Sequence, residues 1–345
     1  MPDRITKENN NNNNSNNSEV ETKDLSKVDI NKFLKMNTVK CNVFIQLGSN
    51  KFIKLINANE LYDLDLIKRY INKKIEYLFI PKNNFKSFMD EYSGNLSAIL
   101  NSTDVNNDDN KITIQTEVLT SARNRARVFG IDDDVVNQAT ATTNSVFSMV
   151  QKQDNLSSLL KKMMQKKNYI SEHSMLISVI ATYIATNMNW IGESTIQKLS
   201  MAAMLHDVLL KSDELAMIDN INTPVFEGLS NHDKKAVLDH PYKISLLVDE
   251  IQNFLPDVAE IILTHHETPE GDGFPKKMSA LRTTQLSCLF IITEDFVNHI
   301  YNLEKATAEE IEKIESYCKE RYSKGNYRKP LEGLLKTTQR MKLGQ

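Results

Sequence analysis

The spacing of apolar residues changes along the chain and divides it into segments of different character. Residues 1–36 are polar, with an asparagine run at positions 9–14 and almost no large apolar residue before Leu25. A segment of this composition cannot bury enough apolar surface to offset the entropy that it loses on ordering. We therefore predict a disordered tail over residues 1–36.

Residues 37–93 show the pattern of a small α/β domain. Apolar residues alternate with polar ones on both sides of a turn sequence at 48–51, which predicts a β-hairpin. Helical spacing follows as far as Ile75, and then come a strand at 77–81 and a short helix at 85–92. The order ββαβα contains no cluster of catalytic residue types, so we interpret the domain as an interaction or sensory module.

Residues 94–130 are predicted to be a linker. Positions 101–110 are polar and acidic, and positions 111–127 have a strand-like pattern that turns helical. From residue 131 to 345 the spacing is helical almost throughout, and Asp132–Asp134 place negative charge where a helix N-terminus favours it. The predicted fold class is a small N-terminal α/β domain followed by an all-α helical bundle.

Composition and charge exclude some functions. With 40% hydrophobic and 25% charged residues, the chain of 345 residues has the composition of an ordinary globular protein. Its formal net charge of −3 provides no basic field of the kind that drives binding to nucleic acid. We therefore expect no nucleic-acid partner.

The cysteines and the lengths of the apolar runs indicate the cellular compartment in which the protein is expected. Cys41, Cys288 and Cys318 are odd in number and far apart, which argues against a disulfide framework and a cysteine-ligated zinc site and favours a reducing compartment. The chain shows no signal-peptide pattern and no run of about 18 apolar residues. We expect a cytoplasmic protein without a membrane span.

Candidate chemistry is concentrated in two short motifs. His265, His266 and Glu267 run directly into a loop rich in glycine and proline at 271–275, and the pair His206-Asp207 lies upstream at the end of an apolar run. Neutral imidazoles and carboxylates are ligands that divalent transition metals bind. We therefore predict that the two motifs together provide the ligands of one metal centre.

An internal His-Asp pair, followed by His-His-Glu and the sequence Gly273-Phe274-Pro275, resembles the HD-GYP family. This family is a branch of the HD-domain metal-dependent phosphohydrolases, and its members typically hydrolyse the bacterial second messenger cyclic di-GMP. The resemblance covers about the last two thirds of the chain. It implies that residues 131–345 form an HD-GYP helical bundle around a dinuclear centre of iron or manganese.

The resemblance also implies roles for individual residues, with Asp207 as the carboxylate that bridges two metals. The implied ligands are His173 and His206 at one metal, His240, His265 and His266 at the other, and a last carboxylate, Glu294, with Asp295 in reserve. Taken alone, His173 lies in an apolar stripe where a histidine is more often a core residue. Because Pro241 favours a first helical turn, we expect His240 at the start of a helix.

Several positions depart from the family pattern. The lysine that follows the His-Asp pair is displaced by one position, to Lys211, and the family's Arg-Pro-Tyr segment is replaced by residues 302–305. Phe274 replaces a tyrosine, which keeps a ring for stacking on guanine but loses the hydroxyl. Tyr169 stands where some members carry a glutamate ligand for a third metal. The candidate catalytic residues are Asp207 and Lys211, and the candidate substrate-binding residues are Lys211, Gly273, Phe274 and Lys305.

Three functional hypotheses follow. The first is a phosphodiesterase in which a metal-activated hydroxide cleaves cyclic di-GMP to pGpG or GMP. The alternative is a catalytically weak or inactive HD-GYP module that binds cyclic di-GMP or a protein partner such as a diguanylate cyclase. The displaced Lys211 and the missing Arg-Pro-Tyr segment motivate this alternative. A third possibility, hydrolysis of another nucleotide or phosphate ester, shares the same metal core.

Overall fold

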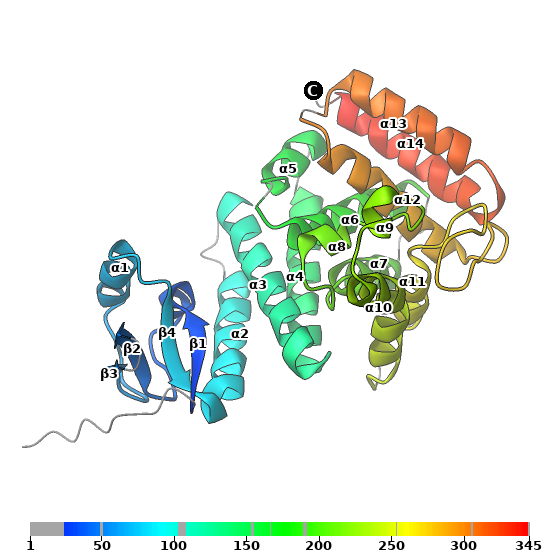
Figure 1. Cartoon of the computed structure of the whole chain (residues 1–345). Coiled ribbons are helices and arrows are strands. Elements are labelled where there is room, and N and C mark those ends of the chain that lie inside the picture. The colour runs from blue at the N-terminus through cyan, green and yellow to red at the C-terminus, as the bar shows by residue number, and fades with distance from the viewer. Residues whose placement is uncertain are drawn as a thin grey trace, which may run out of the picture. The chain divides into compact units, whose positions relative to one another are not determined.

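The chain divides into two compact units, residues 1–95 and 96–345 (Figure 1). The computed structural model describes residues 24–343 except 49–50, 103–107, 153–154, 166, 189–191, 253 and 305. The first unit contains the strands and the second is helical, so the predicted fold class is confirmed.

The first unit is built on a four-stranded antiparallel sheet with the order β1-β4-β2-β3. β2 and β3 form the predicted hairpin, in which Val43 lies opposite Ile56. The elements are β1 (Leu25–Asp29), η2 (Ile30–Lys35), β2 (Val43–Gly48), β3 (Lys51–Ile56), α1 (Leu64–Asn72), β4 (Tyr77–Pro81), η3 (Lys82–Asn84) and α2 (Phe85–Asn101). Helix α2 is longer than the predicted helix, and the division between the two units falls within it.

The boundary predicted for the disordered tail has to be corrected. β1 and η2 both lie inside the predicted tail of residues 1–36, because β1 pairs along its length with β4. Their few apolar side chains, including Val28, Ile30 and Phe33, are buried. A short strand that is completed by a distant partner needs little apolar sequence of its own. Residues 1–23 lie outside the described part of the chain.

The second unit is a bundle of helices. Its elements are α3 (Asp108–Phe129), α4 (Asp133–Lys152), α5 (Leu156–Met163), α6 (Tyr169–Asn187), α7 (Glu193–Leu205), α8 (Asp213–Ala216), α9 (Pro224–Glu227), α10 (Asn231–Asp249), α11 (Val258–Thr264), α12 (Gln285–Tyr301), α13 (Ala308–Arg321), η4 (Gly325–Tyr327) and α14 (Arg328–Leu343). None of the helices in the described residues is long and apolar enough to cross a membrane.

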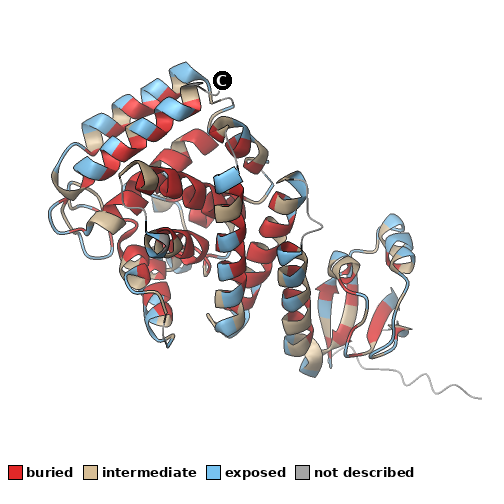
Figure 2. Cartoon of the chain, turned by 180° about the vertical axis from the view of Figure 1, so that it is seen from behind, coloured by how far each residue is buried: buried red, intermediate tan, exposed pale blue. Residues whose placement is uncertain are grey.

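Helix α6 forms the centre of this bundle. Every residue from Tyr169 to Ala185 is buried, because the helix is apolar on most of its surface and its other side chains are mostly small hydroxyls, together with Glu172 and His173. A helix that is apolar all round must be surrounded by others, and α6 packs against α4, α7, α12 and α14. Figure 2 shows these buried residues in red inside the bundle. The candidate ligand His173 therefore lies at the middle of the core.

The segment predicted as a linker, residues 94–130, is mostly helical. The strand-like pattern expected within 111–127 was wrong, since α3 is one continuous helix. Residues such as Ile112, Leu119 and Ala126 are buried at helical spacing. Packing of this face against α4 outweighs the strand preference of the β-branched residues near its start.

Helix α10 also differs from the prediction. It begins at Asn231, where the side chain of Ser230 caps it by accepting from the N–H of Asp233, and it continues through Pro241. The prediction that His240 begins a helix was therefore wrong. His240 lies in the middle of α10, one residue before a proline that cannot donate a backbone hydrogen bond.

Candidate metal centre

The helical bundle brings all seven predicted metal ligands together. They come from α6, the end of α7, α10, the end of α11 and α12, and every one is buried. Their ligand atoms form two groups, each with its atoms within 4.8 Å of one another. One group is His173, His206 and Glu294, and the other is Asp207, His240, His265 and His266.

Asp207 lies between the two groups and turns one oxygen to each. Its Oδ2 is 3.3 Å from Nε2 of His206, and its Oδ1 is 3.2 Å from Nε2 of His240. In the first group, Oε1 of Glu294 is 3.6 Å from Nε2 of His206 and 3.8 Å from Nε2 of His173. A carboxylate placed in this way has the geometry to bridge two cations.

Three of the histidines are oriented by the same backbone contact. Nδ1 of His206, His240 and His265 lies 2.9, 2.7 and 2.6 Å from the carbonyl oxygen three residues earlier. A carbonyl can only accept, so each Nδ1 carries the proton and each Nε2 presents a lone pair to the site. For His206 and His265 these carbonyls lie in the last turn of α7 and α11, where helix carbonyls lack a partner.

His240 lies within a helix, and Pro241 explains why a carbonyl is available to it. The contacted oxygen belongs to Val237, four residues before Pro241. In a regular helix the N–H of residue 241 would donate to this oxygen, but proline has no N–H. Pro241 therefore leaves the Val237 carbonyl to the ring of His240.

Replacing Pro241 with alanine is expected to stabilise the fold and weaken metal binding at the same time. Alanine supplies the N–H that competes for the Val237 carbonyl, and it removes a helix-interior proline that costs up to about 3 kcal/mol. Loss of an orienting contact of this kind typically weakens metal affinity about 10-fold or more. Urea midpoints and metal titrations measure the two effects, and a lower midpoint with unchanged affinity would contradict the assignment.

Several buried polar atoms of the centre lack a hydrogen-bond partner among the described residues. Nε2 of His240 and Nε2 of His265 face each other at 3.1 Å, although both present lone pairs. His173, His206, Asp207 and Glu294 each have at least one buried side-chain atom without a hydrogen bond. Such atoms are costly unless a cation or a donor satisfies them. The donor set of imidazoles and carboxylates fits a divalent cation in each group.

The electrostatics of the centre agree with this chemistry. Burial, reinforced by the neighbouring imidazoles, holds the pKa of His265 and His266 well below the usual value. Their rings are therefore neutral and ready to bind a metal at neutral pH. Burial and the nearby carboxylates of Asp219 and Asp207 raise the pKa of Glu294. A bound cation would oppose this shift and favour the carboxylate form.

Comparison with known proteins agrees with the geometry. Residues 155–324, which include all seven ligands, match the family described as "HD domain". Residues 155–324 therefore form an HD domain. The structure is similar to that of Bd1817, described as an HDG"Y"P protein from Bdellovibrio bacteriovorus, with a TM-score of 0.54 and 18% sequence identity. The similarity covers 91% of this chain and 100% of Bd1817. None of the curated proteins matches the chain significantly.

The predicted HD domain is thus confirmed and is of the metal-dependent hydrolase type, and its fold is similar to that of the protein described as HDG"Y"P. The ligand positions themselves were found from the order of histidines and carboxylates in the sequence. Glu294 enters the first group, whereas the reserve candidate Asp295 does not. Asp295 instead accepts a hydrogen bond of 2.6 Å from the hydroxyl of Tyr322 and lies 3.3 Å from Nδ1 of His299.

The loop that follows His266 packs against the ring of His266. The ring of Phe274 stacks on the ring of His266, with 4.5 Å between centroids and 18° between planes, and Phe274 is only 5% exposed. It therefore offers little surface for stacking on a guanine, which was its predicted role. Gly273 allows the loop to approach this closely, because a Cβ there would lie 2.4 Å from the carbonyl oxygen of His266. Phe274 and Gly273 thus pack directly against His266.

Glu267 fixes the same loop. It is buried, and its two oxygens accept hydrogen bonds from the backbone N–H groups of Lys276 and Met278, at 2.6 and 2.7 Å. A carboxylate used in this way is a structural clamp rather than a metal ligand. It closes the loop over residues 267–278 around His266.

Of the two predicted substrate-binding lysines, Lys211 is described, and its side chain is paired on α10. Nζ of Lys211 lies 2.5 Å from Oδ1 of Asp233 on α10, with 47% of its side chain exposed. The helix α7 has ended before Lys211, but the chain directs this lysine toward α10 and away from the ligand groups. Lys305 lies outside the described residues.

The position associated with a third metal is filled by an aromatic ring. Tyr169 stacks on His173 with 4.9 Å between ring centroids, and its hydroxyl donates to Oδ1 of Asn298 at 2.9 Å. Glu172 is occupied elsewhere, since it accepts hydrogen bonds from the backbone N–H groups of residues 167 and 168 and from the hydroxyl of Tyr301. The described residues thus provide two ligand groups here.

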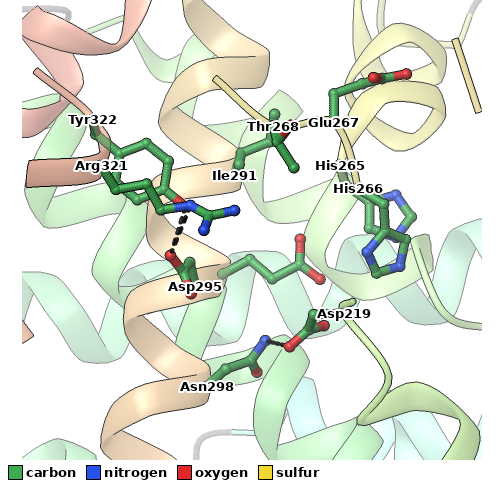
Figure 3. A pocket seen from close by; sticks show the side chains of 11 residues that line it. Asp219, His265, His266, Glu267, Thr268, Ile291, Asp295, Asn298, Arg321 and Tyr322 are labelled. Atoms are coloured by element: carbon green, nitrogen blue, oxygen red, sulfur yellow. Dashed lines mark hydrogen bonds and ion pairs between the residues drawn. The ribbon is translucent and has the colours of Figure 1, made fainter. Parts of the chain in front are cut away.

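A pocket opens beside the ligand groups, and it contains residues that the sequence did not indicate (Figure 3). His265, His266 and Glu294 reach it from the metal centre. Asp219 and Arg321 come from distant segments, and Asp219 accepts a hydrogen bond of 2.5 Å from Nδ2 of Asn298. Neither residue belongs to a motif, so only the folded structure reveals their position.

Proposed function

We propose that this HD domain is a phosphodiesterase that holds two divalent cations, iron or manganese, and hydrolyses cyclic di-GMP to pGpG or GMP. The observation that carries the proposal is the placement of Asp207, with one carboxylate oxygen toward each ligand group. When bound, two cations at such a site supply Lewis acidity and lower the pKa of water, which is the chemistry that phosphodiester hydrolysis needs.

The chain's own residues prepare the site for this reaction. Backbone carbonyls hold His206, His240 and His265 in the tautomer that presents Nε2. Burial alone would raise the pKa of Asp207, but the neighbouring imidazoles of His206 and His240 outweigh burial and keep this pKa well below its usual value. Asp207 is therefore a carboxylate at neutral pH. Burial of the whole set excludes bulk water and strengthens each electrostatic contact.

Elemental analysis and an assay on the same sample test the proposal. Protein purified without oxygen is expected to contain two metals per chain and to hydrolyse cyclic di-GMP. A chelator is expected to abolish the activity, and added iron or manganese to restore it. Protein that carries two metals but leaves cyclic di-GMP and simple phosphodiester analogues intact would overturn the proposal.

A second candidate is a module that binds cyclic di-GMP, or a partner such as a diguanylate cyclase, without rapid hydrolysis. The engagement of Lys211 with Asp233 and the burial of Phe274 under His266 favour it, because both residues are removed from substrate contact. Calorimetry with cyclic di-GMP would select this candidate if binding occurs without product. Rapid hydrolysis of cyclic di-GMP would exclude it.

A further inference from the structure

The pocket beside the metal centre has one cationic side chain among the described residues that line it. Arg321 is the last residue of α13, and it reaches the pocket that His265, His266 and Glu294 reach from the other helices. In Figure 3 its guanidinium projects from the side opposite the two histidines. The other charged groups in the wall include the carboxylates of Asp219 and Asp295.

The guanidinium of Arg321 is held in place without its donors being used. Its Nε lies 4.0 Å from Oδ2 of Asp295, beyond hydrogen-bond distance, and it makes no hydrogen bond with any residue that the structure describes. The aromatic rings of Tyr317 and Tyr322 lie 5.9 and 5.7 Å from its central carbon. The side chain is 35% exposed, so water or a ligand can reach it.

Asp295 does not need Arg321 as its hydrogen-bond donor. Its oxygens already receive the hydroxyl of Tyr322 and lie beside Nδ1 of His299. Arg321 is therefore placed by the electrostatic attraction of Asp295 and by two aromatic faces, while its planar set of N–H groups remains available. A guanidinium in this state suits two oxygens of one phosphate group, which it can bind through parallel hydrogen bonds.

We propose that Arg321 binds a phosphate group of the substrate in this pocket and supplies the grip that Lys211 does not. The inference rests on the proposed function, since it assigns a specificity residue to the same site. It narrows the substrate class to compounds that place an anionic phosphate oxygen between the ligand groups and the end of α13. Arg321 acts in binding, so its loss is expected to affect KM more than kcat.

The test uses the full-length, metal-loaded protein and inorganic phosphate as the probe. Arg321→Met is expected to weaken phosphate binding about 10- to 100-fold in calorimetry, the range typical of a lost charge-assisted hydrogen bond. Arg321→Lys keeps the charge but loses the bidentate geometry, so we expect an intermediate loss. The matched control is Arg340→Met, because Arg340 is exposed on α14. This control is expected to bind phosphate as the wild type does.

Further measurements distinguish a binding role of Arg321 from a structural one. Metal content and melting temperature are expected to stay unchanged in Arg321→Lys, and the affinity of the wild type is expected to fall more steeply with added salt than that of Arg321→Met. Wild-type affinity in Arg321→Met, or no phosphate binding by the wild type, would overturn the inference. Equal losses in Arg321→Met and Arg340→Met would do so as well.

Hydrolysis of cyclic di-GMP is measured on the same preparations. If the wild type binds phosphate through Arg321 but forms no product, the proposed phosphodiesterase activity fails while the inference about Arg321 stands. If the wild type forms product and Arg321→Met keeps its KM, the activity stands and the inference fails.

Discussion

Replacing Asp207 with asparagine is expected to lower hydrolysis of cyclic di-GMP about 10³-fold or more and to empty both metal positions. Each oxygen of Asp207 faces a different ligand group, at 3.3 Å from His206 and 3.2 Å from His240. An asparagine amide has one oxygen and no charge, so it cannot serve both groups. Elemental analysis and turnover measured on the same sample check both parts.

The control for this substitution is Asp249→Asn. Asp249 is exposed at the end of α10 and belongs to neither ligand group, so metal content and turnover are expected to match those of the wild type. An Asp207→Asn protein that retains two metals per chain would show that Asp207 does not bridge them. Retention of one metal would leave Asp207 as a ligand of the other position only.

Replacing Gly273 with alanine is expected to destabilise the protein by about 1–3 kcal/mol, the usual cost of an added methyl group in a packed site. The new Cβ would lie 2.4 Å from the carbonyl oxygen of His266 and 2.6 Å from Cα of Glu267, so backbone atoms must move. Because the loop supports His266, metal affinity should fall together with stability. Urea denaturation and metal titration measure the two losses.

Gly48→Ala provides the matched control. A Cβ at Gly48 meets no atom within 4 Å, so the same chemical change is expected to leave both the urea midpoint and metal content unaltered. If Gly273→Ala is as stable as the wild type and binds metal normally, the loop does not constrain His266 in the way described.

The grouping of the candidate metal ligands could be predicted because residue type and order along the chain indicate their chemistry. Histidines and carboxylates within or just after apolar helices have few structural roles in common, and a family pattern placed them in one set. His173 required that pattern, since its surroundings alone indicate only a buried helix. Glu294 was separated from Asp295 by spacing, and the structure places Glu294 with the ligands.

The substrate pocket could not be predicted in the same way. Lys211 and Phe274 were assigned by position in a motif, but local packing directs one toward Asp233 and the other against His266. Arg321 was missed because it lies in no motif, and only the tertiary path of α13 returns it to the pocket. The sheet of the first unit shows the same limit, since β1 depends on a partner about fifty residues away.

The use of main-chain oxygens to orient His206, His240 and His265 has an evolutionary consequence. No side-chain substitution can delete a carbonyl, so His206 and His265 keep this contact while the surrounding sequence drifts, whereas the contact of His240 also depends on Pro241. The neighbouring pocket is lined by side chains, and each of these can be changed by substitution. Descendants of this fold can therefore change the lining of the cavity while inheriting the same arrangement of imidazoles.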